Sequence, residues 1–152
     1  MSTYNGDEPY VIVEADGGSR GNPGPAGFGA LVREPKTKDV LAERSGTLGV
    51  ATNNVAEYSG LIAGLEAAAE LGATRVEVRM DSKLVIEQMA GRWKVKHPNM
   101  KPLADQAQQL AAAFDRIAYV WVPRAENSAA DRLANLAMDA AASAVPYDGG
   151  RG

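Results

Sequence analysis

The chain has 152 residues, 45% of them hydrophobic and 23% charged, with 16 Gly, 8 Pro, a single His and no Cys. This length predicts one globular domain, and the absence of cysteine excludes a disulfide scaffold, a thiolate zinc site and a cysteine nucleophile. The formal net charge of −3 on its face argues against a nucleic-acid partner. The polar N-terminus and the short apolar stretches predict neither a signal peptide nor a membrane span, so we expect a cytoplasmic protein and a monomer.

The first third of the chain predicts three strands. Tyr10–Ala15 is a β-rich run that ends at the turn signal Asp16-Gly17-Gly18, and a loop follows over Ser19–Gly24. Ala26–Arg33 and Val40–Leu48 are two further strands separated by a short turn. Together they predict an antiparallel meander.

The rest of the chain alternates helices with strands. Apolar residues at helical spacing predict a long helix from Asn54 to Leu71, with a stripe of small residues for close packing. The later predicted elements are a strand at Arg75–Met80, helices at Ser82–Ala90 and Leu103–Phe114, a strand at Ile117–Val122 and a helix at Ser128–Ala142. Strands separated by helices pair in parallel through right-handed crossovers. The fold class is therefore α/β, a mixed sheet flanked by helices.

We expect the folded domain to span residues 10–142. Residues 1–9 form an N-terminal tail in this interpretation, and residues 143–152, which include the Gly-rich Val145–Gly152, form a C-terminal tail or linker. Such a linker would suit a chain that is fused to a further C-terminal domain.

Four carboxylates lie at predicted element junctions. Asp16 and Asp81 follow the first and fourth strands, whereas Glu57 and Asp131 lie in the first turns of two helices. If the first and fourth strands are parallel neighbours, all four side chains meet at the carboxyl edge of the sheet, where α/β proteins bind ligands.

Each of these carboxylates also has a local structural explanation. Glu57 three residues after Asn54, and Asp131 three residues after Ser128, fit capping boxes. Asp81 would cap the helix after it, and Asp16 would serve its glycine turn. Taken together the four favour a functional site, because converging acids repel one another unless a cation neutralises them. Hard oxygen ligands indicate Mg²⁺ or Mn²⁺, and two such ions about 4 Å apart suit phosphodiester hydrolysis.

Four segments in order resemble type 1 ribonuclease H. They are Asp16–Gly29 (DGGSRGNPGPAGFG), Thr52–Glu57 (TNNVAE), Asp81-Ser82 and Asn127–Asp131 (NSAAD). The resemblance runs across about residues 10–142. It implies a five-stranded mixed sheet in the order 3-2-1-4-5, and an endonuclease that cuts the RNA strand of RNA/DNA hybrids to leave 3′-hydroxyl and 5′-phosphate ends.

The resemblance also implies roles for individual residues. Asp16, Glu57, Asp81 and Asp131 would hold two Mg²⁺ ions, for which Mn²⁺ would substitute. The expected substrate contacts lie in the glycine-rich loop, at the start of the long helix and after the fourth strand: Gly17, Gly18, Ser19, Asn22, Thr52, Asn53, Asn54 and Ser82. Without the resemblance, the glycines fit a plain hairpin connection equally well.

A basic run, Gly91–Lys101, stands out in this acidic chain. Arg92, Lys94 and Lys96 could bind backbone phosphates, and Trp93 could contact a sugar or base. The alternative is a solvated connection whose Trp packs into the core. The run is shorter than the basic protrusion that some family members carry.

The loop before the last helix has no histidine, unlike that of many relatives. Arg124 is its substitute, as in an arginine-bearing branch of the family. Because arginine stays protonated, its role would be electrostatic, on the scissile phosphate or the leaving product. The alternative is a surface cation paired with Glu126.

Two other functions stay open at this point. One is a nuclease that acts on DNA, and the other is a non-catalytic module that binds hybrids or a protein partner. The glycine-rich loop with Thr52-Asn53-Asn54 argues against the first, and the presence of all four acids argues against the second.

Overall fold

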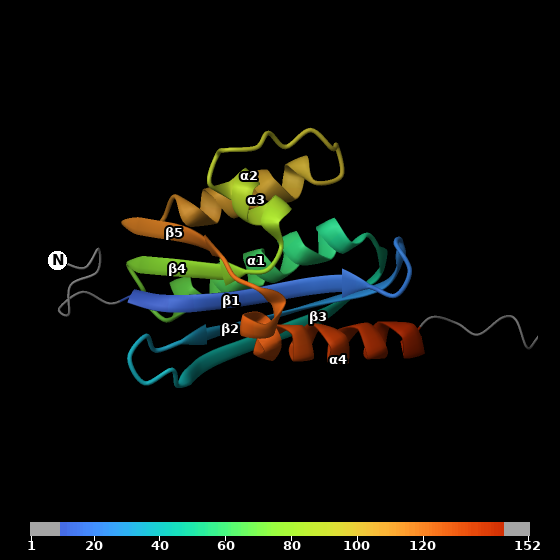
Figure 1. Cartoon of the computed structure of the whole chain (residues 1–152), viewed down its shortest axis with the longest axis horizontal. Helices are drawn as coiled ribbons and strands as arrows, with labels where there is room; N and C mark the ends of the chain where they lie inside the picture. The colour runs from blue at the N-terminus through green and yellow to red at the C-terminus, as the bar shows by residue number, and fades with distance from the viewer. Residues whose placement is uncertain (1–9, 145–152) are drawn as a thin grey trace, which may run out of the picture.

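The computed structural model describes residues 10–144; the predicted tail 1–9 and the predicted linker from residue 145 onward lie outside the described residues. One sheet in the order β3-β2-β1-β4-β5 forms the centre of the molecule (Figure 1). Its strands are β1 (Tyr10–Ser19), β2 (Gly24–Arg33), β3 (Val40–Ala51), β4 (Arg75–Met80) and β5 (Arg116–Trp121). The helical segments are α1 (Asn53–Glu70), α2 (Lys83–Met89), α3 (Lys101–Ala111), η1 (Arg124–Asn127) and α4 (Ser128–Ala144). The predicted α/β class and strand order are confirmed.

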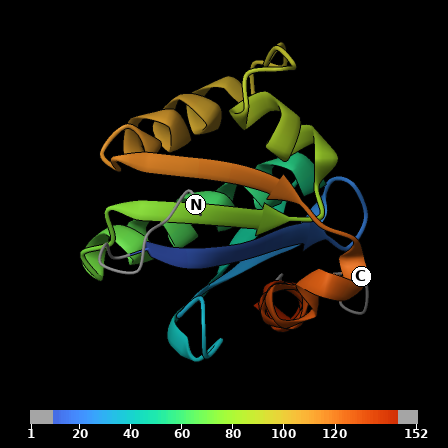
Figure 2. The same ribbon diagram turned by 60° about the vertical axis from the view of Figure 1, so that its left-hand side comes forward.

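Strand direction places three strand ends at one edge of the sheet. β1, β2 and β3 form the antiparallel meander, whereas β4 is parallel to β1 and β5 is parallel to β4. The carboxyl ends of β1, β4 and β5 therefore lie together, and the arrowheads of all three point the same way in Figure 2. The chain segments that leave these ends form the site described below.

Helices cover both faces of the sheet. On one face, Val13 and Ala30 belong to the core cluster that includes buried residues of α1, α2 and α3. On the opposite face, the backbone of α4 packs directly on Gly27 and Gly29 of β2. Figure 2 shows α4 end-on beside the sheet. The sheet is thus the middle layer of a three-layer structure.

The first strand is longer than the sequence predicts. Asp16-Gly17-Gly18 is not a turn: these residues pair with Gly29, Phe28 and Gly27 of β2, and β1 continues to Ser19. The glycines serve helix packing instead, because a Cβ atom on Gly17 would lie 2.2 Å from the carbonyl oxygen of Ala56 in α1. Asp16 consequently lies within the strand rather than at its end.

Other boundaries differ by smaller amounts. α3 begins at Lys101 and ends at Ala111 rather than spanning Leu103–Phe114, since Pro102 is well accommodated in a first helical turn. β3 extends to Ala51, and α4 continues to Ala144, two residues past the predicted domain end. The short helix η1 was not predicted. Among the helices of residues 10–144, none is long and apolar enough to cross a membrane.

Candidate active site

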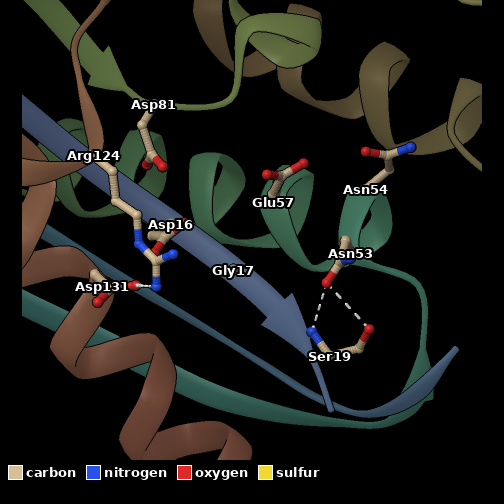
Figure 3. A pocket seen from close by; sticks show the side chains of 9 residues that line it. All are labelled: Asp16, Gly17, Ser19, Asn53, Asn54, Glu57, Asp81, Arg124 and Asp131. Atoms are coloured by element: carbon tan, nitrogen blue, oxygen red, sulfur yellow. Dashed lines mark hydrogen bonds and ion pairs between the residues drawn. The ribbon is translucent and has the colours of Figure 1, made fainter. Parts of the chain in front are cut away.

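A polar cavity of about 530 Å³ opens beside the carboxyl ends of β1 and β4 (Figure 3). The four predicted carboxylates line it together, each from a different element: Asp16 from β1, Glu57 from α1, Asp81 from the segment after β4 and Asp131 from α4. Gly17, Ser19, Asn53, Asn54 and Arg124 complete the lining. The predicted convergence of side chains that are far apart in the sequence is therefore present.

Close backbone packing sets the positions of Asp16 and Glu57. α1 lies so near β1 that a Cβ on Gly60 would come within 2.5 Å of the Asp16 carbonyl oxygen, and one on Gly17 would meet the backbone of Ala56 and Glu57. The small-residue stripe on the helix permits this approach, since Ala56 is fully buried there. Glycine and alanine thus hold two carboxylates beside one another.

Neither Glu57 nor Asp81 is explained by helix capping. Thr52 caps α1, where its hydroxyl accepts a hydrogen bond from the Val55 amide at 3.3 Å. Ser82 caps α2 by accepting from the Val85 amide at 3.3 Å, and its hydroxyl also donates to Glu57 Oε1 at 3.1 Å. The structural alternatives for these two acids are therefore disfavoured, and Ser82 orients Glu57.

Arg124 faces the acidic cavity. Its guanidinium lies 3.4 Å from Asp131 Oδ1 rather than pairing with Glu126, and its side chain is 76% exposed. In Figure 3 the guanidinium extends across the cavity mouth toward Asp16 and Asp131. Because the Arg124 guanidinium is exposed to solvent at the acidic cavity, an anion such as a phosphate can reach it directly.

Burial and the nearby charge of Asp81 raise the pKa values of Asp16 and Glu57. Burial, followed by the charge of Asp81, raises the pKa of Asp16 to about 8. Burial and Asp81 likewise raise the pKa of Glu57 to about 7, although the Ser82 hydroxyl opposes the shift. The cavity therefore concentrates more negative charge than its own groups neutralise.

This excess charge predicts a pH-dependent loss of stability when divalent ions are absent. A carboxyl whose pKa is raised on folding favours the folded state only while protonated, so the free energy of unfolding should fall as pH rises from about 4 to about 8. Asp16→Asn removes the charge and should exceed wild type by about 2 kcal/mol at pH 8, with little difference near pH 4. Urea unfolding in EDTA at several pH values measures the pH dependence of wild type and the difference between wild type and Asp16→Asn.

Asp105→Asn is the matched control, because Asp105 is an exposed carboxylate on α3 outside this cavity. It should follow the wild-type pH dependence. Equal pH dependence in wild type and Asp16→Asn would show that the Asp16 carboxylate is not destabilised by its surroundings.

The donor set fits a hard divalent cation. All four acids offer carboxylate oxygens, the ligands that Mg²⁺ and Mn²⁺ prefer. As the side chains stand in residues 10–144, no three His, Cys, Asp or Glu groups are already gathered to hold one ion. Ion binding would therefore draw the carboxylates closer together. The raised pKa of Asp16 means that its ionised form is disfavoured in this cavity, and a bound cation would offset that penalty.

The predicted substrate residues near the cavity also brace one another. Asn53 Oδ1 accepts from the Ser19 amide at 2.8 Å and from its hydroxyl at 3.2 Å, and Asn22 Oδ1 accepts from the Asn53 amide at 3.1 Å. Both asparagine side chains thus use their oxygens within the protein. Their amide groups are the donors left for a ligand, and phosphate and ribose oxygens accept such bonds.

A second cavity lies next to the first. Asn54 lines both, and the second, of about 170 Å³, also includes Asn22, Thr52, His97, Asn99 and Met100. His97 is exposed, as its loop position predicts, and its Nδ1 accepts from the Asn99 amide at 3.1 Å. The sequence alone gives His97 and Asn99 no role, because only the fold brings their loop to the start of α1.

Six of the predicted substrate residues lie outside the lining of both cavities. One of them is Ser82, whose hydroxyl donates to Glu57 instead. Gly18 packs toward Met138 of α4. Arg92 pairs with Glu87 through two hydrogen bonds of 2.7 and 2.9 Å, which offsets its charge. Trp93 is 45% exposed rather than packed in the core, and Lys94 and Lys96 are exposed. Exposure of the run favours the interpretation as a binding segment, which stays a prediction.

The fold and the acidic cavity define the chain as an α/β protein of the ribonuclease H-like class. A family model described as "Reverse transcriptase-like" matches residues 14–137. The N-terminal RNase H domain of Rv2228c from Mycobacterium tuberculosis, solved as a maltose-binding-protein fusion, is 63% identical with a TM-score of 0.89, covering 91% of this chain and 100% of that one. LC11-RNase H1, solved with an RNA/DNA hybrid, is 40% identical with a TM-score of 0.81, covering 86% and 98%. The chain belongs to the ribonuclease H family.

The sequence relatives include a much longer protein. The bifunctional protein Rv2228c of M. tuberculosis is 64% identical over 138 residues, which are 91% of this chain and 38% of that relative. The chain thus spans well under half the length of this relative.

Proposed function

We propose that this chain is an endonuclease that hydrolyses the RNA strand of RNA/DNA hybrids, leaving 3′-hydroxyl and 5′-phosphate ends. The observation that carries the proposal is the convergence of Asp16, Glu57, Asp81 and Asp131 in one cavity. The relative LC11-RNase H1, which was solved with an RNA/DNA hybrid, supports this choice of substrate.

Asp16, Glu57, Asp81 and Asp131 would hold two Mg²⁺ ions, with Mn²⁺ as a substitute. When bound, such ions supply an activated water and stabilise the leaving oxygen of a phosphodiester. The chain itself supplies the negative charge that recruits the ions. Ser82 holds Glu57 in place through the hydrogen bond from its hydroxyl to Glu57 Oε1.

Arg124 would act on the substrate electrostatically. Its exposed guanidinium at the cavity mouth can contact the scissile phosphate or the departing 5′-phosphate. Its pairing with Asp131 is long and solvent-exposed, so little free energy opposes a switch to a phosphate partner.

Hybrid recognition would use groove shape and the 2′-hydroxyl of RNA, with little base preference. The donors available for this are the amide groups of Asn22, Asn53 and Asn54 near the start of α1. The helix N-terminus beside Thr52 favours a backbone phosphate. Trp93, Lys94 and Lys96 would extend the contact along the strand.

Substrate choice tests the proposal directly. With Mg²⁺ or Mn²⁺, the protein should cut an RNA/DNA hybrid and leave a duplex DNA of the same sequence intact, because duplex DNA lacks the 2′-hydroxyl. Duplex RNA and single-stranded RNA complete the panel, and gel analysis of end-labelled strands measures cutting. Cleavage of the DNA duplex would instead identify a DNA nuclease, and binding of the hybrid without cutting would identify a non-catalytic module.

The monomeric state, the cytoplasmic location and the fusion to a C-terminal domain stay predictions. A relative that extends far beyond the matched segment is compatible with such a fusion.

A further inference from the structure

Asn127 of η1 is buried completely and joins β1 to the segment after β4. Its Nδ2 donates to the carbonyl oxygen of Ala15 in β1 at 2.9 Å and to Asp81 Oδ1 at 2.7 Å. One side chain therefore links β1, the segment after β4 and the short helix that leads into α4. The sequence alone assigns no role to this residue.

The orientation of this amide is fixed by its neighbours. Both groups that face Nδ2 are acceptors, so a rotated amide would place Oδ1 against two oxygens. Asn127 Oδ1 is itself buried and has no hydrogen-bond partner within residues 10–144. Since an unpaired buried carbonyl costs free energy, the arrangement is retained at a cost to stability, which is typical of a residue kept for a site.

The bond to Asp81 also decides which oxygen of that carboxylate is available. Oδ1 accepts from Asn127 at 2.7 Å, and Asp81 lines the cavity. Oδ2 is therefore the oxygen that this bond leaves for a ligand. The indole Nε1 of Trp121 donates to the Asp81 carbonyl oxygen at 3.1 Å, which holds the backbone of the same residue. Asp81 is thus restrained at both its backbone and its side chain.

We propose that Asn127 is a positioning residue that presents Asp81 Oδ2 to a divalent cation, an inference that rests on the proposed function. Hydrogen bonds to a metal-binding carboxylate orient that ligand. Their loss typically lowers metal affinity or activity by about 10- to 100-fold. Asn127 itself lies too deep to contact a nucleic acid. Removal of the Asn127 side chain should therefore lower the affinity for the ion and lower kcat, and it should leave KM for the hybrid unchanged.

The test measures Mg²⁺ binding by calorimetry on the full chain without nucleic acid. Asn127→Ala should weaken Mg²⁺ binding by about 10-fold and lower kcat at a fixed Mg²⁺ concentration. Tyr58→Phe is the matched control, because it removes another buried hydrogen bond, from the Tyr58 hydroxyl to Gln88 Oε1 at 2.7 Å, and leaves the cavity intact. The control should lose stability and keep wild-type Mg²⁺ affinity. Equal Mg²⁺ affinity in Asn127→Ala and wild type would overturn the inference.

A second measurement does not depend on a variant that folds. In wild-type protein, the NMR signals of the Asn127 side-chain amide should shift on Mg²⁺ addition with the same midpoint as the Asp81 backbone amide, and an Asn127 signal that stays unchanged would overturn the inference. If Mg²⁺ binding depends on Asn127 but no hybrid is cut, the inference holds and the proposed function fails. If the hybrid is cut and Asn127 affects neither Mg²⁺ binding nor kcat, the function holds and the inference fails.

Discussion

Asp81→Asn should lower kcat for hybrid cleavage by about 10³-fold, which corresponds to about 4 kcal/mol of transition-state stabilisation. The asparagine oxygen can still accept the hydrogen bond from Asn127, so the fold should be retained. Its NH₂ group would then take the place of Oδ2 and offer a cation a donor instead of a ligand. Single-turnover cleavage of a labelled hybrid with Mg²⁺ measures the loss, and thermal unfolding verifies the fold.

Asp105→Asn carries the same change of charge on an exposed residue of α3. It should cut the hybrid at the wild-type rate, which separates loss of a ligand from loss of net charge. If Asp81→Asn keeps activity within 10-fold of wild type, the acidic cavity is not the hydrolytic centre.

Gly17→Ala should destabilise the domain by about 3 kcal/mol or more. The added methyl group would lie 2.2 Å from the Ala56 carbonyl oxygen and 2.7 Å from the Glu57 amide nitrogen, and these are backbone atoms that move only if α1 moves. A displaced α1 would also carry Glu57 away from Asp16. Urea unfolding gives the free energy, and cleavage measured under conditions where the variant is folded gives the effect on the site.

The neighbouring glycine supplies the comparison. A Cβ on Gly18 would meet the flexible side chain of Met138 at 3.3 Å, so Gly18→Ala should change the free energy of unfolding by less than about 1 kcal/mol. Similar losses in the two variants would contradict the close approach of α1 to β1 as the reason for glycine at position 17.

Periodicity was sufficient to predict most elements of the fold. Apolar residues at helical spacing between Asn54 and Leu71 gave a helix close to the observed Asn53–Glu70. The same reasoning failed at Asp16-Gly17-Gly18, because glycine in sequence favours a turn, whereas here it permits a strand and a helix to touch. The local conformational propensity of a residue does not predict how closely two elements pack in the folded protein.

The site was predictable only in part, for a related reason. Each acid had an acceptable local explanation, and the parallel pairing of β1 with β4 is what turns Asp16 and Asp81 into neighbours. Asn127 could not be assigned because its partner Ala15 is 112 residues away, and an asparagine before a helix ordinarily suggests a cap. The loop that carries His97 and Asn99 is likewise brought to the site by tertiary packing alone.

The cavity takes Glu57 from the helix on one face of the sheet and Asp131 from the helix on the other. Neither layer alone contains a complete set of acids, and α4 is the last element of the described chain. Because α4 is synthesised after the other described elements, the four acids would be assembled only when this helix docks on the sheet. A chain that has formed its sheet but has not yet docked α4 would still lack the Asp131 carboxylate in the cavity.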